Sequence, residues 1–315
     1  MPVVAVAGGT GKLGRTIVEA IAKNKNHSLI VLSRKLDPSF EATYGVAIVA
    51  VDYHDVAALT KVLEEHNVYT VVSALTMGPA PDGSRPNEIE LIKAADASKT
   101  TKRMISSDWG IPHTDDHIPK LVSVIHKLEA QEVLKQVCNL ETTYFLIGFY
   151  LDYWGIPGVK SNMGPFPIAI DIPNNTAAIP GTGDTPITFT HSTDVAKFVS
   201  AFLDLDEWDP ITYVGGDSVT WNQFLQYAED AKGSKFQTTF DSIEKLKSGE
   251  CTELPSQPLA YSYVPKKDFQ ILAAALGEWT SEGVFNFAPG TLLNNRLPNI
   301  ETIKVKDMLD KAWKQ

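Results

Sequence analysis

Three glycines near the start of the chain have a spacing that suits phosphate binding. They lie in the segment 8–14, Gly-Gly-Thr-Gly-Lys-Leu-Gly, which follows the apolar run 3–7 and precedes a helical pattern. Glycines allow a sharp turn close to a pyrophosphate, and a helix N-terminus presents unpaired N–H groups to that anion. This order of strand, glycine turn and helix predicts a dinucleotide site. The residues expected to form it are Gly8, Thr10, Gly11, Lys12, Leu13 and Gly14.

A basic pair follows the second apolar run of the chain. Arg34 and Lys35 come directly after residues 29–33, about twenty residues beyond the last glycine. In dinucleotide folds an acidic residue at this place binds the ribose 2′-hydroxyl, whereas a basic residue accommodates a 2′-phosphate. A guanidinium can bind that phosphate through two parallel hydrogen bonds. The pair therefore favours NADP(H) over NAD(H), and a solvated basic pair at a strand end is the alternative.

Further cofactor contacts are expected where later strands end. Asp52 and Tyr53 close the third strand, where a carboxylate could accept from the adenine amino group with the ring packed beside it. An Asx turn is the alternative for Asp52. Small residues after the fourth strand would let the backbone pass under the cofactor. The remaining expected contacts are Ser73, Ala74, Leu75, Ser107, Lys127 and Phe149.

One lysine is the candidate for proton transfer. Many dehydrogenases pair a tyrosine with a lysine four residues later, on the helix after the fifth strand, and the lysine lowers the tyrosine pKa. Here Lys127 occupies the lysine position, but Ser123 stands at the tyrosine position. We therefore expect Lys127 to supply or relay the proton, with a surface lysine on a polar helix face as the alternative. A second such pair, Tyr263 and Lys267, encloses Pro265 and is assigned no role.

Aromatic residues gather after the fifth and sixth strands. Ligands bind outside the carboxyl ends of the strands in open parallel sheets, so we expect a small aromatic or apolar substrate there. The alternative is that most of these rings form core. A histidine in the loop after the fifth strand lies where a substrate could reach, and a solvated loop histidine is the alternative. The expected substrate-binding residues are Trp109, His113, Tyr150, Tyr153, Trp154 and Phe166.

The elements that position these residues alternate in the first half of the chain. Strands are expected at 3–7, 29–33, 46–51, 69–74, 103–107 and 143–147, and helices after the glycines and at 57–64, 88–98 and 121–137. Strict alternation of strand and helix indicates an α/β fold with a doubly wound parallel sheet, the NAD(P)-binding Rossmann fold.

The second half of the chain does not continue this alternation of strands and helices. Proline and glycine recur from Gly155 to Pro186, which is typical of loops and edge strands. Later helices are expected at 195–203, 221–231 with Thr220 as N-cap, near 243–246, 266–276 and 303–313, and a strand at 211–214. We expect an NADP-binding domain over 1–154, to which 187–216 returns. A smaller, irregular C-terminal substrate domain would comprise 155–186 and 217–315.

The net charge, the cysteine count and the apolar runs of the chain indicate which classes of binding partner to expect. The 315 residues carry a formal net charge of −10 with no basic block, which weighs against nucleic-acid binding. The two cysteines, Cys138 and Cys251, suggest neither a metal site nor a disulfide framework and are expected to be buried thiols. No apolar run approaches the ~20 residues of a membrane span, and a strand starting at Pro2 leaves no room for a leader. These observations predict a cytoplasmic protein with a small-molecule substrate and no metal.

Taken together, the motifs resemble the NmrA-like, isoflavone-reductase-like family of atypical short-chain dehydrogenases/reductases. The matching parts are the segment 8–14, Arg34, Val-Asp-Tyr-His-Asp at 51–55, Val-Ser-Ala-Leu at 72–75 and the helix that bears the lysine. Residues 102–110, Lys-Arg-Met-Ile-Ser-Ser-Asp-Trp-Gly, are similar to the family's Lys-Arg-Phe-x-Pro-Ser-Glu-Phe-Gly. The resemblance covers residues 1–150, with Asp108 and Trp109 in place of the family's Glu and Phe.

The resemblance implies an NADP(H)-binding fold and an NADPH-dependent reductase. Reductase members of the family act on carbon–carbon double bonds, benzylic ethers or carbonyls of aromatic natural products, with a lysine as general acid or base. Other members are regulators that bind the dinucleotide and a protein partner without turnover. The expected function is thus a reductase. The alternatives are a non-catalytic NADP(H) sensor with a protein partner, or an isomerase or dehydratase on the same fold.

Overall fold

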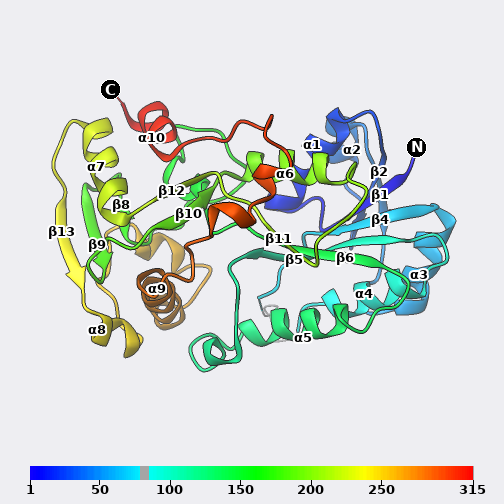
Figure 1. The fold of residues 1–315 in the computed structure, drawn as a ribbon, viewed down its shortest axis with the longest axis horizontal. Coiled ribbons are helices and arrows are strands. Elements are labelled where there is room, and N and C mark those ends of the chain that lie inside the picture. Colours follow the sequence, from blue (N-terminus) through cyan, green and yellow to red (C-terminus); the bar gives the residue numbers. More distant parts are fainter. Residues whose placement is uncertain (79–84, 315) are drawn as a thin grey trace. The chain divides into compact units, whose positions relative to one another are not determined.

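The computed structural model describes residues 1–78 and 85–314, and the chain forms two compact units (Figure 1). Unit 1 comprises residues 1–116, 123–146 and 195–213, and unit 2 comprises 117–122, 147–194 and 214–315. The chain therefore passes between the units several times.

Unit 1 is built on a seven-stranded parallel sheet. Its strands are β1 (Val3–Ala7), β2 (Ser28–Ser33), β3 (Ala47–Ala50), β4 (Val68–Ser73), β5 (Arg103–Gly110), β6 (Glu141–Leu146) and β11 (Ile211–Tyr213). The order β11-β6-β5-β4-β1-β2-β3 contains the dinucleotide-binding order 3-2-1-4-5-6, which confirms the predicted Rossmann fold. The order reverses beside β1, so the glycine segment leaves the sheet at its topological switch point.

Helices cover both faces of this sheet. They are α1 (Lys12–Lys23), α2 (Pro38–Tyr44), α3 (Val56–Glu65), α4 (Glu88–Ala97), α5 (Val124–Leu134) and α6 (Ser192–Phe202), whose first turn belongs to unit 2. Helices α3, α4 and α5 lie side by side on one face, whereas α1 and α6 lie on the other (Figure 1). The apolar face of α3, with Leu59 and Leu63, packs with Leu91 of α4 and Leu134 of α5 into one buried core.

Two boundaries in unit 1 differ from the sequence prediction. The helix expected over 121–137 is α5, which begins at Val124 and ends at Leu134. The short helix α2 was not predicted, although its start carries a capping signal. Asp37 accepts the N–H of Phe40, and Pro38 occupies the first turn, where a missing N–H costs nothing.

Unit 2 contains two small sheets. One has the order β12-β10-β7 and the other β13-β9-β8. The strands are β7 (Phe149–Tyr150), β8 (Ile170–Asp171), β9 (Thr176–Pro180), β10 (Ile187–Thr190), β12 (Asp217–Val219) and β13 (Gln237–Asp241). The stretch 155–186 was expected to form loops and edge strands. That prediction is wrong for β9, which is the central strand of its sheet because it pairs with β13 on one side and with β8 on the other.

The helices of unit 2 surround an aromatic core. They are α7 (Trp221–Lys232), α8 (Ile243–Lys247), α9 (Lys266–Ser281) and α10 (Val305–Trp313). Short 3-10 turns are η1 (Asp115–His117), which begins at the end of unit 1, and η2 (Leu151–Trp154), η3 (Gln257–Ala260), η4 (Pro289–Thr291) and η5 (Leu293–Asn295). The predicted cap Thr220 is confirmed, because it forms a capping box with Gln223.

The cysteines are less buried than expected. Cys138 is exposed in the turn after α5, where its N–H donates to Asp96, and Cys251 is partly exposed. The prediction of two buried thiols is therefore wrong for Cys138. Within residues 1–78 and 85–314, no helix combines the length and the apolar character that crossing a membrane requires.

Candidate functional site

The glycine segment forms a tight turn between β1 and α1. Gly8 has a left-handed φ of +71°, and a Cβ there would lie 2.9 Å from the carbonyl oxygen of Ala74. A Cβ on Gly14 would lie 2.2 Å from the carbonyl oxygen of Gly8, so only glycine fits at this position. The N–H of Gly11 donates to the Gly8 carbonyl at 2.9 Å and closes the turn. The first residues of α1 follow directly, and no side chain caps the helix.

Tyr53 supports this turn from within the protein. Its hydroxyl donates to the carbonyl of Leu32 at 2.8 Å and accepts the N–H of Gly8 at 3.2 Å. The side chain is 5% exposed, and burial raises the pKa of its hydroxyl. Tyr53 thereby ties the end of β2 to the first glycine. Asp52, beside it, is exposed and accepts the N–H of His54 at 2.9 Å, which is the Asx turn that the sequence left as its alternative.

The basic pair after β2 borders a hollow of about 560 Å³. Its lining residues are Thr10, Ser33, Arg34, Lys35, Leu36, Asp37 and Pro38. Arg34 and Lys35 are both exposed, and in the described part of the chain the Arg34 guanidinium has no hydrogen-bond or ion-pair partner. Thr10 belongs to the glycine turn, so the hollow adjoins that turn. These residues fit a dinucleotide with an added phosphate: the turn would hold the pyrophosphate, and Arg34 and Lys35 the 2′-phosphate.

A buried carboxylate joins the ends of β4 and β5. Glu88, the first residue of α4, is 1% exposed. It accepts the hydroxyl of Ser73 at 2.6 Å, the hydroxyl of Ser106 at 2.7 Å and the N–H of Ser107 at 2.9 Å. Burial raises the pKa of the Glu88 carboxyl, while these three hydrogen bonds act in the opposite direction. Ser107 also donates its hydroxyl to the carbonyl of Leu75 at 2.7 Å, which links the two strand ends a second time.

Lys127 lies at the carboxyl end of β5, on the first turn of α5. Its Nζ donates to Oδ1 of Asp108 at 2.8 Å and to the Asp108 carbonyl at 3.0 Å. The Lys127 side chain is 18% exposed and that of Asp108 is 2% exposed. The second oxygen of Asp108, Oδ2, accepts the amide of Gln131 at 2.9 Å. The candidate lysine is thus a half-buried ammonium held by a buried carboxylate.

The backbone is unusual next to this ion pair. Trp109 has a left-handed φ of +52°, which is uncommon for a bulky residue and is often found at functional sites. Its indole N–H donates to the carbonyl of Ser73 at 2.9 Å, and its ring packs on Phe145. Only 7% of Trp109 is exposed. His113, also predicted to bind substrate, follows in the half-buried loop after β5.

The remaining predicted aromatic residues lie in unit 2. Phe149 and Trp154 are buried in its core, where the Phe149 ring stacks on Phe285 at a centroid distance of 4.1 Å. Tyr150, Tyr153 and Phe166 are only half-buried, and Tyr153 contacts both of the other rings. These three rings form the accessible part of the predicted aromatic set.

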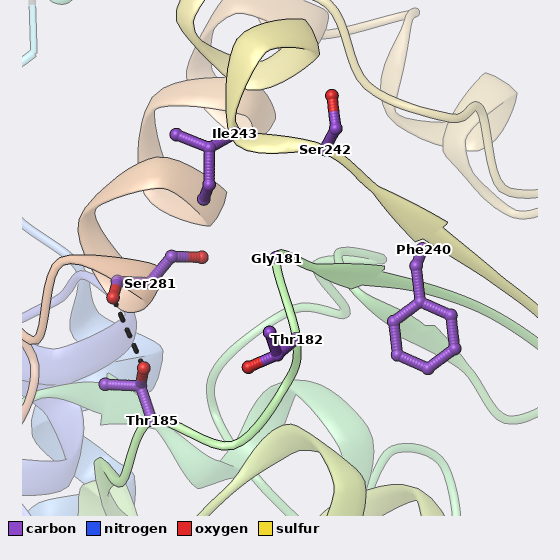
Figure 2. Close-up of a pocket in the computed structure, with 7 residues that line it drawn as sticks. All are labelled: Gly181, Thr182, Thr185, Phe240, Ser242, Ile243 and Ser281. Carbon is purple, nitrogen blue, oxygen red and sulfur yellow. Dashed lines mark hydrogen bonds between the residues drawn. The ribbon is translucent and has the colours of Figure 1, made fainter.

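A second hollow, of about 450 Å³, lies in unit 2 (Figure 2). It is lined by Gly181, Thr182, Thr185, Phe240, Ser242, Ile243 and Ser281. The Thr185 hydroxyl donates to the Ser281 carbonyl at 3.2 Å, and the Ser281 hydroxyl donates to the Gly277 carbonyl at 3.0 Å. No charged side chain lines the hollow. It offers no charged group for proton transfer or for pairing with a phosphate, so we place no chemistry there.

Two residues that hold the strand ends and Asp108 in place, Glu88 and Gln131, were not predicted from the sequence as site residues. Glu88 looks like an ordinary acidic residue in the first turn of a helix, and nothing local shows that it is buried. Gln131 carries a usable signal, because it lies four residues after Lys127 and therefore on the same helix face. Among the described residues, no group of three His, Cys, Asp or Glu side chains is arranged to hold a metal ion.

Comparison with known proteins identifies the family. The model of the NmrA-like family matches residues 2–264. The oxidoreductase BOA1 of Botryotinia fuckeliana is 33% identical over 300 residues, covering 94% of this chain and 95% of that protein. The oxidoreductase swnN of Metarhizium robertsii is 30% identical, covering 99% of this chain and 98% of that protein.

Solved structures share the fold over nearly the full length. The complex of leucoanthocyanidin reductase from Vitis vinifera with NADPH has a TM-score of 0.72 at 18% identity and covers 98% of both chains. A structure of AtPrR2 with NADP+ and (+)-pinoresinol has a TM-score of 0.75 at 20% identity, also over 98% of both chains. The chain therefore belongs to the NmrA-like family, and its relatives over almost the whole length are oxidoreductases.

Proposed function

We propose that this protein is an NADPH-dependent reductase of the isoflavone-reductase-like type, acting on a small aromatic or apolar substrate with a carbonyl or an unsaturated bond. The observation that carries the proposal is that the glycine turn and Lys127 lie at the same edge of the unit 1 sheet. The glycine turn leaves β1, and Lys127 lies at the end of β5. In open parallel sheets this carboxyl edge is where ligands bind.

NADPH is favoured by the chemistry of the hollow beside the glycine turn. Arg34 and Lys35 present two cationic side chains there, and no carboxylate contacts the Arg34 guanidinium among the described residues. A bare ribose hydroxyl would leave both charges without a partner, whereas a 2′-phosphate would bind them. When bound, NADPH supplies a hydride to a carbon atom of the substrate.

Lys127 supplies the proton that balances this transfer. The ammonium Nζ donates its proton to the substrate atom that gains negative charge, an oxygen for a carbonyl or a carbon for a double bond. The neutral amine keeps its place through Asp108 and recovers a proton from water. The net change is two electrons and two hydrogens gained by the substrate. A solved structure with this fold holds NADP+ together with (+)-pinoresinol, which supports a small-molecule substrate beside the cofactor.

The test is NADPH consumption with a panel of small aromatic compounds that bear a carbonyl or a conjugated double bond. We expect turnover with at least one class. Lys127→Ala should reduce kcat on the order of 10² to 10⁴-fold. Lys135→Ala is the matched control, because Lys135 follows the same helix and its side chain is 68% exposed. Equal activity of the two variants would remove Lys127 from the mechanism.

The same experiment separates the two other readings of the fold. NADPH binding without turnover of any compound, together with a protein that co-purifies, would indicate a sensor. Conversion of a substrate without net NADPH consumption would indicate an isomerase or a dehydratase.

A further inference from the structure

We propose that Asp108 is a positioning residue that fixes the Lys127 ammonium for proton transfer. This inference rests on the proposed function, because it gives a role to a residue that acts through Lys127. The carboxylate and the carbonyl of Asp108 both accept from Nζ, at 2.8 and 3.0 Å, so a single residue holds two of the three ammonium N–H groups.

Asp108 is itself immobilised. Its Oδ2 accepts the Gln131 amide at 2.9 Å, and its side chain is 2% exposed. Both carboxylate oxygens are therefore bound, and rotation of the side chain would break both contacts. Gln131 and Lys127 project from the same face of α5, and both bind the Asp108 carboxylate. The position of the carboxylate relative to the helix is therefore fixed at two points.

The backbone after Asp108 makes room for the ammonium. A Cβ on Gly110 would lie 3.1 Å from Nζ, closer than most such contacts. The left-handed turn at Trp109 connects these two residues and is anchored by the indole bond to Ser73. At the end of β5, Nζ thus has two acceptor atoms of Asp108 beside it, and Gly110 next to it carries no side chain.

This arrangement leaves one N–H of Lys127 for a ligand. Within residues 1–78 and 85–314, Nζ has no acceptor other than the two atoms of Asp108. Lys127 therefore keeps one N–H available to a substrate, and its two contacts with Asp108 fix the position of Nζ.

The first test compares Asp108→Asn, Asp108→Glu and the control Glu132→Gln. Glu132 lies on the same helix but pairs with the exposed Lys135. We expect Asp108→Asn to lower kcat on the order of 10²-fold, as misplacement by about 1 Å can. The dissociation constant for NADPH, measured by fluorescence titration, should stay unchanged. Asp108→Glu keeps the charge and should recover part of the loss, and Glu132→Gln should behave as wild type.

A second measurement does not depend on turnover. An amine-selective acylating reagent is applied briefly, and labelling of Lys127 is compared by mass spectrometry with labelling of Lys61, whose side chain is 76% exposed. In the wild type we expect Lys127 to react much more slowly than Lys61. In Asp108→Asn the two rates should approach each other, because the amine is released. Gln131→Ala keeps the ion pair, and in it Lys127 should be labelled at an intermediate rate. This variant replaces Asp108→Asn in the test if Asp108→Asn fails to fold.

The outcomes are distinguishable from those of the proposed function. Unchanged labelling of Lys127 in folded Asp108→Asn would overturn the positioning role, whatever the enzyme does. An unchanged kcat in Asp108→Asn, in a protein whose turnover depends on Lys127, would overturn it as well. Absence of turnover in the wild type would instead reject the proposed function, and the labelling result would still decide whether Asp108 holds Lys127.

Discussion

The Glu88 carboxylate accepts the hydroxyl of Ser73 at 2.6 Å, and this bond fastens the start of α4 to the end of β4. Its other oxygen binds Ser106 and Ser107 on β5. One buried side chain thus joins two neighbouring strand ends at the edge of the sheet where the cofactor is proposed to bind. No cation pairs with Glu88 among its described contacts.

Glu88 should make stability depend on pH. Burial raises the pKa of this carboxyl above its usual 4.5, so the folded state binds the proton more tightly than the unfolded state. The resulting stability is fully present below about pH 4.5 and is lost as the pH rises through the folded-state pKa. Glu88→Gln removes this titration. We therefore expect the free energy of unfolding of Glu88→Gln to improve relative to the wild type as the pH rises from 4.5.

Urea unfolding of both proteins at several pH values measures this difference. Glu65→Gln is the control, since Glu65 lies on the surface with its side chain 57% exposed. Glu88→Ala should lose about 1–3 kcal/mol at every pH, because the N–H of Ser107 loses its acceptor. Parallel pH profiles for the wild type and Glu88→Gln would contradict the raised pKa.

Gly14 should tolerate no side chain. The Cβ of an alanine would meet the Gly8 carbonyl oxygen at 2.2 Å, and that atom also accepts the Gly11 N–H. The turn must therefore open, which we expect to cost about 1–3 kcal/mol of unfolding free energy. NADPH affinity should fall with it, because the N–H groups of the turn move. The control is Gly290→Ala, where a Cβ meets no heavy atom within 4 Å. Equal NADPH affinities of the two variants would show that the turn does not bind the cofactor.

The sequence predicted most of unit 1 because its signals are local. An apolar run such as Val3–Ala7 specifies a buried parallel strand, and alternation with helices specifies the doubly wound sheet. The unit 2 sheets were missed because β7 and β8 have two residues each and are defined by partners far away in the chain. The same limit applies to the site. Lys127 could be proposed as a site residue from its place on a helix, whereas the burial of Glu88 arises only when β4, β5 and α4 meet.

Arg34 should decide the choice between the two nicotinamide dinucleotides. Its guanidinium borders the hollow beside the glycine turn and has no partner among the described residues, so it is free to bind a phosphate. Charge-assisted hydrogen bonds of this kind contribute about 1.5–3 kcal/mol. Arg34→Ala should therefore weaken NADPH binding about 10- to 100-fold. NADH lacks the 2′-phosphate, and its affinity should hardly change.

Fluorescence titration of both dinucleotides against the wild type, Arg34→Ala and Lys23→Ala tests this expectation. Lys23 ends α1 as an exposed basic residue outside the hollow, so Lys23→Ala controls for the loss of one positive charge from unit 1. Raising the salt concentration should weaken NADPH binding to the wild type more than to Arg34→Ala, because screening acts on the charge pair that the variant lacks. If Arg34→Ala lost affinity for NADPH and for NADH equally, Arg34 would not bind the 2′-phosphate. It would instead stabilise the glycine turn that both dinucleotides share.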